Sequence, residues 1–347
     1  MKRRSGRRIR RGLGGLGGLV LAASAGAAEL RAVDTFDGVA QAAAAATPAQ
    51  AEALRAVAYE PGAFAVRVED AGRGSRPRAE LFFPAPEPAA GRGDRAAPVR
   101  VSWWEAAGAQ ERGDAPRPAV LVVHSLAPGQ PLARGLASAV AAAGVDAFVV
   151  DLPGYGARPP LPGRSPGAEA VLSGAGGVAD ARRALDAVAA LPGVDGDRVV
   201  IAGVSLGSFA ASAVAGLDDR PAALVSFLGG GSAYEALRDG AKDAGFLRDE
   251  LLRGGETMDS LRALLRPVEP LTLAGRLDPA RVWVASAAAD RVIPPANTEA
   301  FVRAVGGVGL AEDHWIRRPG NHYTAGFALP GVAQLLVELA GDARADR

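Results

Sequence analysis

The chain of 347 residues contains no cysteine, only three histidines and, among its 39 basic residues, only two lysines. Without cysteine it can form no disulfide, no thiolate metal site and no lipid-modified cysteine at a cleavage point. The basic residues are scattered and are not interleaved with aromatic residues, so nothing favours nucleic-acid binding. No stretch of the central region has the length of a membrane span without proline, glycine or charge.

Positive charge is concentrated at the amino terminus. Residues 1–27 contain seven basic residues and no acidic residue, so the remaining chain has 32 basic against 38 acidic residues, a net charge of −6. An apolar core over Leu13–Ala23 and the small residues Ala25-Gly26-Ala27 complete the pattern of a signal peptide. The core is too short and too rich in glycine for a stable membrane anchor. We therefore expect export to the periplasm or the exterior, by the general secretory route or, given the paired arginines, the twin-arginine route.

The most informative segment is Val199–Ser208, in which a run of β-branched and small apolar residues ends in Gly-x-Ser-x-Gly. A helical pattern over Phe209–Leu217 follows at once. The segment therefore predicts a strand, a sharp turn and a helix, with Ser205 at the apex. The flanking glycines lack Cβ and allow strand and helix to approach closely. This geometry favours Ser205 as a nucleophile, and an ordinary glycine-rich turn is the alternative.

A serine nucleophile requires a base and an acid. His322 lies in a Gly/Asn-rich loop between the last expected strand and the last expected helix, whereas His314 lies within the strand pattern and is expected to pack or to face solvent. Asp290 follows the buried strand pattern Arg281–Ser286, 85 residues after Ser205 and 32 before His322. Helix capping is the alternative for Asp290, weakened by two intervening prolines. We predict His322 as the base and Asp290 as the acid.

Hydrophobic periodicity predicts the α/β fold class. Alternating patterns over residues 64–68, 79–83 and 99–104 are typical of antiparallel strands at the start of a sheet. After Pro118, strands and helices alternate, which predicts a mostly parallel central sheet with helices on both faces. We expect strands near 119–123, 145–150, 198–202, 222–227, 281–286 and 313–317, and helices near 131–143, 177–190, 207–216, 297–305 and 331–340. The expected domains are a signal peptide over 1–27, an N-terminal appendage over 28–78 and a catalytic domain over 79–347 with a helical insertion over 229–280.

The order serine, aspartate, histidine is that of α/β-hydrolases, and roughly residues 79–340 resemble this superfamily. Within it the chain is most similar to the dienelactone-hydrolase-like and acyl-peptidase-like esterases. The segment Val123–Gly129 resembles the family's oxyanion loop, Asp151–Gly156 resembles its loop after the fourth strand, and Val194–Arg198 is typical of the segment before its nucleophile strand.

This resemblance implies which groups bind the oxyanion. The matching donors are the backbone N–H groups of Leu126 and Leu206, the residue after the nucleophile. Ser125 departs from the family pattern because glycine usually stands at its position. The Cβ of Ser125 therefore affects which conformation this loop can adopt.

The insertion over residues 229–280 is too long for a plain connection. The resemblance implies that it lies over Ser205 and shapes the acyl pocket, and helices that merely pack beside the sheet are the alternative. We expect Phe246, Met258 and Tyr155 to line this pocket. Further apolar candidates in the insertion are Leu247, Leu251 and Leu252.

The predicted activity is hydrolysis of a small-molecule carboxylic ester through an acyl-enzyme, which requires no metal and no cofactor. A serine peptidase or acyl-peptide hydrolase is one alternative, although the prolyl-oligopeptidase type normally carries a propeller that the preceding residues are too few to form. A non-catalytic binding protein on a hydrolase fold is the other alternative, but such proteins have usually lost a member of the triad. The sequence does not determine the oligomeric state.

Overall fold

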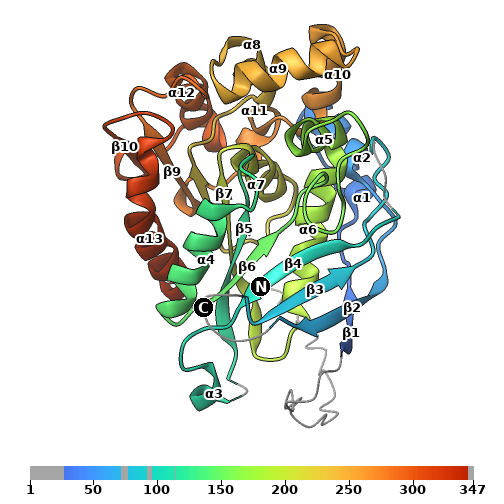
Figure 1. Cartoon of the computed structure of the whole chain (residues 1–347), viewed down its shortest axis with the longest axis vertical. Coiled ribbons are helices and arrows are strands. Elements are labelled where there is room, and N and C mark those ends of the chain that lie inside the picture. Colours follow the sequence, from blue (N-terminus) through green and yellow to red (C-terminus); the bar gives the residue numbers. More distant parts are fainter. Residues whose placement is uncertain (1–26, 72–76, 92–95, 114, 343–347) are drawn as a thin grey trace, which may run out of the picture.

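The structure, a computed structural model, describes residues 27–71, 77–91, 96–113 and 115–342. The signal peptide predicted over residues 1–27 lies outside the described residues, except for Ala27. The described residues form one ten-stranded sheet in the order β1-β2-β3-β4-β6-β5-β7-β8-β9-β10 (Figure 1). The strands are β1 Ala28–Val33, β2 Ala63–Asp70, β3 Ala79–Phe83, β4 Val99–Trp104, β5 Arg117–Val123, β6 Asp146–Val150, β7 Val194–Val204, β8 Ala223–Phe227, β9 Val282–Ala287 and β10 Trp315–Arg318.

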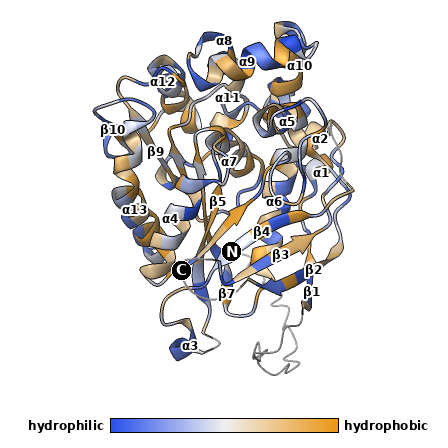
Figure 2. Cartoon of the chain, in the orientation of Figure 1, coloured by the Kyte–Doolittle hydropathy of each residue, from blue (hydrophilic) through white to orange (hydrophobic). Residues whose placement is uncertain are grey.

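The sheet has an antiparallel part and a parallel part. Strands β1 to β4 pair antiparallel, β4 pairs antiparallel with β6, and the strands from β6 to β10 are all parallel. The parallel strands β6 and β8 are buried along their whole length, and β5 is buried from Ala119 to Val123 and is coloured as hydrophobic in Figure 2. Continuous apolar strands are expected where helices cover both faces of a sheet. The structure confirms the predicted α/β fold.

Helices cover the two faces of the parallel part. On one face α4 packs over β6 and β5, and its partner α13 packs over β5, β7 and β8. On the other face α6 packs mainly over β7, and its partner α7 packs over β7 and β8. The helices are α1 Gly38–Ala43, α2 Pro48–Val57, α3 Ala109–Arg112, α4 Pro131–Ala142, α5 Pro166–Ser173, α6 Ala175–Ala189, α7 Leu206–Leu217, α8 Ala233–Asp239, α9 Asp243–Arg253, α10 Met258–Leu265, α11 Pro270–Leu273, α12 Pro295–Ala304 and α13 Leu329–Asp342.

The segment predicted as an appendage, residues 28–78, joins the same sheet. Strand β1 pairs with β2, and β2 pairs with β3, so the sheet continues without a break into this segment. Helix α2 also buries Leu54 and Val57 against the main core. The sequence predicted β2 but not β1, a short strand at the edge of the sheet that pairs only with β2 among the described strands.

Other elements also differ from the predicted ones, among them β10 and α5. The strand expected over 313–317 begins later, at Trp315, because Glu312–His314 form a 3-10 turn. Helix α5 was not expected, since Pro166 and Gly167 are typical of a loop. Proline is tolerated in the first turn of a helix, and the Ser165 hydroxyl caps α5 by accepting a hydrogen bond from Ala168 N–H.

One helical stretch, Thr324–Asp342, is long and apolar enough to span a membrane by length and composition. It includes α13, whose inner face packs against the sheet and α4 through Val332, Ala333, Leu336 and Ala340. An apolar helix at the core of a globular domain passes the same test.

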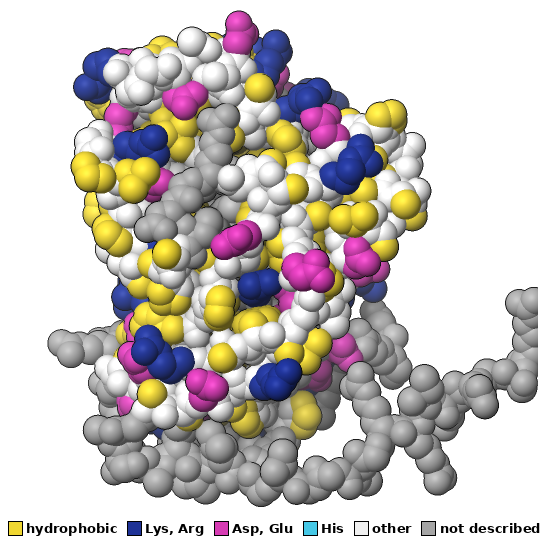
Figure 3. All heavy atoms as spheres, turned by 90° about the vertical axis from the view of Figure 1, so that its right-hand side faces the viewer, with side chains coloured by type: hydrophobic (Ala, Val, Ile, Leu, Met, Phe, Trp, Pro, Cys, Tyr) yellow, Lys and Arg dark blue, Asp and Glu magenta, His cyan; other side chains and the backbone are white. Residues whose placement is uncertain are grey.

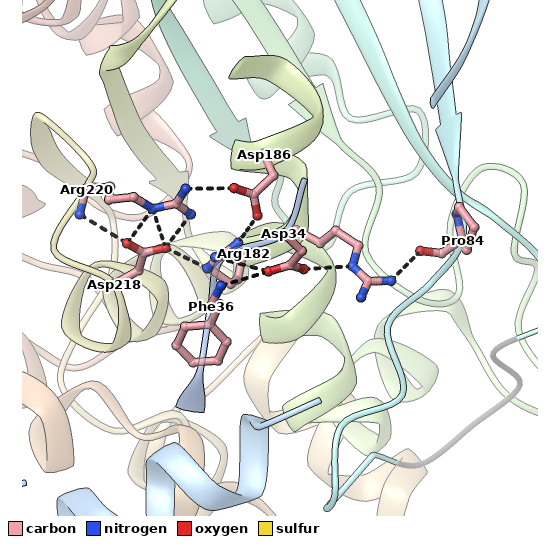
Figure 4. A network of polar contacts seen from close by, with 8 residues as sticks. Asp34, Phe36, Pro84, Arg182, Asp186, Asp218 and Arg220 are labelled. Carbon is pink, nitrogen blue, oxygen red and sulfur yellow. Dashed lines mark hydrogen bonds and ion pairs between the residues drawn. The ribbon is translucent and has the colours of Figure 1, made fainter. Parts of the chain in front are cut away.

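On the face shown in Figure 3, acidic and basic side chains are interspersed among apolar and neutral atoms. Beneath the surface, a buried ionic network joins the amino-terminal segment to α6 and α7 (Figure 4). Arg182 in α6 is fully buried, with Nη2 3.3 Å from Asp34 Oδ1 and Nε 2.6 Å from Asp218 Oδ2, and it also pairs with Asp186. Arg220 completes the network at 2.7 Å from both Asp186 and Asp218. Arg183 also joins, with Nε 3.0 Å from Asp34 Oδ2. Three buried carboxylates thus share three guanidinium groups, of which Arg182 is fully buried and Arg220 is partly exposed.

Replacing Arg182 by alanine should destabilise the fold strongly. The change leaves buried carboxylates without their central partner, which typically costs about 3–5 kcal/mol of unfolding free energy. Urea denaturation of the variant measures this loss. The matched control is Arg281→Ala, which removes an exposed pair with Asp278 at 3.5 Å and should change stability by less than about 1 kcal/mol. Equal losses in the two variants would contradict the importance of the network.

Candidate active site

The predicted site residues lie where the order of the parallel strands reverses. Strand β5 lies between β6 and β7, so the chain progresses in opposite directions from it, first to β6 and later to β7. Ligands of open α/β sheets bind in the crevice at such a switch point, outside the carboxyl ends of the strands. His124 follows β5 and Ser205 follows β7. The topology therefore places the two predicted loops on opposite sides of one crevice.

Ser205 has a backbone conformation that L-residues rarely adopt, with φ 53° and ψ −116°. Two close approaches enforce it. A Cβ at Gly203 would overlap the carbonyl oxygen of Gly207, and a Cβ at Gly207 would overlap the carbonyl oxygen of Val123. The Ser205 N–H also donates to Phe227 O at 2.9 Å. Such strain costs on the order of 1–3 kcal/mol and persists only where the surroundings determine the conformation.

The structure brings the three predicted side chains into one hydrogen-bonded chain. Ser205 Oγ lies 2.9 Å from His322 Nε2, and His322 Nδ1 lies 2.7 Å from Asp290 Oδ2. Because a carboxylate only accepts hydrogen bonds, Nδ1 carries the proton and Nε2 accepts from the serine hydroxyl. Asp290 Oδ1 accepts from the N–H groups of Val292 and Ile293, at 2.8 and 3.0 Å, and so fixes its own loop. Ser205 and Asp290 are only 6% and 7% exposed, so both residues are almost entirely buried.

His124 orients the loop that carries Leu126. Leu152 N–H donates to His124 Nε2 at 3.1 Å, so Nδ1 carries the proton and donates to Ser125 O at 2.7 Å. Burial lowers the pKa of His124, which keeps the ring neutral as this pattern requires. The Ser125 carbonyl and the Leu126 N–H belong to one planar peptide and point in opposite directions. Holding the carbonyl at His124 therefore fixes the direction of the predicted oxyanion donor.

Tyr155 has a role that the sequence did not indicate. Its hydroxyl donates to Leu126 O at 2.7 Å, and its ring lies edge-on to His124 with 4.4 Å between the ring centroids. Tyr155 thus holds the peptide that follows Leu126, while His124 holds the peptide that precedes it. The hydroxyl is engaged with the backbone and does not project into a pocket. Leu206 needs no such support, because the first N–H groups of a helix have no partner within it.

The other predicted pocket residues lie elsewhere. Phe246 is 74% exposed on α9, because the neighbouring residues Leu247 and Leu251 occupy the buried side of that helix. Met258, the first residue of α10, is half-buried and packs against the core. The structure therefore does not bring Phe246 and Met258 together with Tyr155 around one pocket. His314 lies outside the site, with Nδ1 3.1 Å from Val282 O.

The insertion touches the loops of the triad. Ala241 N–H, between α8 and α9, donates to Arg291 O at 2.7 Å, directly beside Asp290. Burial and the nearby Asp243 carboxylate raise the pKa of Tyr323, the neighbour of His322. These contacts place the junction of α8 and α9 beside the acid and base loops, at the top of Figure 1.

A second set of contacts joins the insertion to α5. Both Ser165 N–H and Ser165 Oγ donate to the carboxylate of Glu250, each at 2.7 Å. Glu250 belongs to α9, and Ser165 caps α5. The insertion and the segment after β6 are therefore held together by these hydrogen bonds.

A cavity of about 400 Å³ lies at the end of the parallel strands opposite to the triad. Arg117 at the start of β5, Gly193 before β7 and Trp103 are among its lining residues. It opens at the amino ends of the parallel strands and contains no triad residue. Among the residues that the structure describes, no group of three or more histidine, aspartate or glutamate side chains is arranged to hold a metal ion.

Glu269 fixes the loop that leads from β8 into the insertion. The carboxylate accepts hydrogen bonds from Ser232 Oγ at 3.1 Å, from Ala233 N–H at 2.6 Å and from Tyr234 N–H at 2.9 Å. Burial, with a smaller contribution from Glu235, raises the pKa of Glu269 to about 7 although these donors oppose the rise. Asn297 holds the preceding residues, since its Oδ1 accepts from Gly231 and Ser232 N–H.

The raised pKa of Glu269 predicts a pH-dependent stability. An unfolded glutamate titrates near 4.3, so the folded protein binds the proton more tightly and loses stability as pH rises from about 4.3 to about 7. Urea unfolding of wild type at pH 5 and pH 8 should show this slope. Glu269→Gln should remove most of it, whereas Glu312→Gln, an exposed control, should keep it. An unchanged slope in Glu269→Gln would show that the carboxylate is ionised throughout.

No family model matches the chain, and no curated protein is similar to it in sequence. Solved structures are similar in fold. Acetyl Xylan Esterase 1 from Thermoanaerobacterium sp. JW/SL YS485 matches with a TM-score of 0.56 and 17% identity, over 89% of this chain and 96% of that chain. An acetyl xylan esterase from Paenibacillus sp. R4 matches with a TM-score of 0.56 and 17% identity, over 83% and 91%. The 2,6-dihydroxy-pseudo-oxynicotine hydrolase matches with a TM-score of 0.54 and 16% identity, over 72% of this chain, which spans just under two thirds, 66%, of that chain.

Proposed function

We propose that the protein is a serine hydrolase that cleaves carboxylic esters through an acyl-enzyme. Its sheet order and the structural similarities, which show the α/β-hydrolase fold, support this proposal. The observation that carries the proposal is the chain of contacts from Ser205 through His322 to Asp290, with 2.9 and 2.7 Å between the paired atoms. A nucleophile, a base and an orienting acid in hydrogen-bond reach are the parts that acyl transfer requires.

The reaction follows from these positions. Ser205 Oγ attacks the carbonyl carbon of the ester, and its proton moves to His322 Nε2. The charged imidazole is stabilised by Asp290 and then gives the proton to the departing alcohol, which leaves Ser205 acylated. Water attacks the acyl-enzyme with the same histidine as base, and the carboxylic acid is released while Ser205 regains its proton. Each step uses groups of this chain and the solvent.

The oxyanion is bound by the backbone N–H groups of Leu126 and Leu206. Loss of one such donor costs about 3–4 kcal/mol of transition-state stabilisation in well-studied hydrolases. His124 and Tyr155 hold the carbonyls on either side of Leu126, so they act as positioning residues. Preorganised donors pay no reorganisation cost when charge develops on the substrate oxygen.

An ester is favoured over a peptide bond because two of the similar structures are described as acetyl xylan esterases. A serine peptidase or acyl-peptide hydrolase would use the same three residues, and hydrolysis of aminoacyl p-nitroanilides would reveal it. A non-catalytic binding protein has no need of the strained conformation at Ser205.

Replacing Ser205 by alanine should abolish hydrolysis of p-nitrophenyl acetate, because loss of the nucleophile lowers kcat on the order of 10⁶-fold. The variant should also lose labelling by a fluorophosphonate. The matched control is Ser212→Ala on the same helix, α7, where the buried hydroxyl has no hydrogen-bond partner and its removal should preserve activity. An active Ser205→Ala variant would end the proposal.

The pH dependence of kcat/KM should identify the base. The base must be neutral to accept the serine proton, so kcat/KM should increase with pH, as general-base catalysis requires. His322→Ala should lose both the activity and this dependence. His314→Ala should retain them, since His314 bonds only to the carbonyls of Pro279 and Val282 among the contacts of the described residues. If only His314→Ala lost activity, the assignment of His322 as the base would be wrong.

A further inference from the structure

A small apolar cavity lies beside the predicted nucleophile. It has a volume of about 50 Å³, is partly open, and is bordered by α5, α6, α7, the start of α8 and the end of α10. Among the described residues, no charged or polar side chain lines it. The lining residues are Leu152, Ala170, Val171, Gly174, Gly177, Val178, Leu206, Phe209, Ala210, Ala233, Leu265 and Val268.

Three lining residues place the cavity at the catalytic edge of the sheet. Leu206 directly follows Ser205 and carries one of the proposed oxyanion donors. Leu152 follows β6 and donates its N–H to His124, which orients the other donor loop. Ala233 begins α8, which leads from the glycine loop after β8. The cavity therefore lies beside residues that carry or orient the two proposed oxyanion donors, and no triad side chain is among its lining residues.

The size of the cavity limits its occupant. One water molecule takes about 30 Å³ of liquid, and a cavity of about 150 Å³ binds benzene. A volume of about 50 Å³ thus has room for one or two carbons. The absence of polar groups from the lining also makes a charged or amide-bearing acyl group unfavourable, because its polar atoms would lose their hydrogen bonds on entry.

We propose that this cavity is the acyl subsite and that the natural substrates are esters of acetyl or propionyl groups. The inference rests on the proposed function and deepens it by naming the acyl class. The methyl or ethyl group of the acyl chain packs against Leu206 and the small residues of α5 and α6. The alcohol part of the ester remains on the other side of the carbonyl, outside the cavity.

Leu265 is the largest of the three residues that the insertion contributes to the cavity, the others being Ala233 and Val268. It lies at the end of α10 and is buried against the core. Leu261, one turn earlier on the same helix, is equally buried but does not line the cavity. The two residues form a matched pair, because truncation of either removes the same atoms from the same helix.

The test is kcat/KM of purified protein on p-nitrophenyl acetate, propionate, butyrate and hexanoate. Wild type should prefer acetate and propionate over hexanoate by at least about 100-fold, since each methylene that a pocket rejects changes kcat/KM by about 10- to 200-fold. Leu265→Ala should raise the ratio of butyrate to acetate about 10-fold or more. Leu261→Ala should leave this ratio unchanged. Ala170→Val, which fills the cavity without truncating the core, should lower propionate relative to acetate.

Labelling of Ser205 by a fluorophosphonate separates the two levels of the proposal. If Ser205 is labelled and wild type prefers hexanoate, or if Leu261→Ala changes the ratio as much as Leu265→Ala, the acyl-subsite assignment is overturned while the serine hydrolase stands. If Leu265→Ala does not fold, Ala170→Val alone decides the assignment. If Ser205 is not labelled and none of the four esters is cleaved, the proposed function itself fails.

Discussion

The positive φ of Ser205 is the constraint on which the rest of the site depends. The conformation is unfavourable for an L-residue. It persists because β5, β7, β8 and α7 pack closely around the turn. Gly203 and Gly207 supply the close approach, and the bond from Ser205 N–H to Phe227 O fixes the turn to the neighbouring strand. One consequence is that the serine hydroxyl and the Leu206 N–H reach the same crevice from adjacent residues.

The surrounding contacts restrict the remaining parts in the same way. Asp290 Oδ1 accepts a hydrogen bond from its own loop, whereas Oδ2 contacts His322. The position of the acid therefore does not depend on the base. His124 and Tyr155 hold the two peptides beside Leu126. These groups are buried, and each of them is either neutral or fully hydrogen-bonded. The geometry of the site therefore exists before a substrate binds. Preorganisation of this kind is the main source of electrostatic catalysis in hydrolases.

Much of this arrangement could be predicted from local sequence. The strand, glycine and helix pattern around Ser205 determines a turn, and the positions of Asp290 and His322 after strand patterns determine the edge on which they lie. Side-chain direction within the insertion could not be predicted. Helix α9 has apolar residues on two sides, Phe246 and Leu252 as well as Leu247 and Leu251, so periodicity alone does not say which side is buried. Tertiary contacts with α5 and α8 decide it.

The buried charges could not be predicted from the sequence either. A helix with two adjacent arginines is typical of a solvated face, yet Arg182 is fully buried because Asp34, Asp186 and Asp218 surround it. Two of these partners are distant in sequence, and only the complete fold brings them together. Strand β1 was missed for the same reason, since its place at the edge of the sheet depends on β2.

The central claim is that Ser205 carries the acyl group during turnover. Acid quenching of the reaction with p-nitrophenyl acetate, followed by peptide mass spectrometry, tests it directly. We expect one acetyl group on the peptide that contains Ser205, formed in wild type and absent from Ser205→Ala. Hydrolysis of the ester with no acetyl group trapped on any peptide, or with acetyl on another residue only, would contradict it.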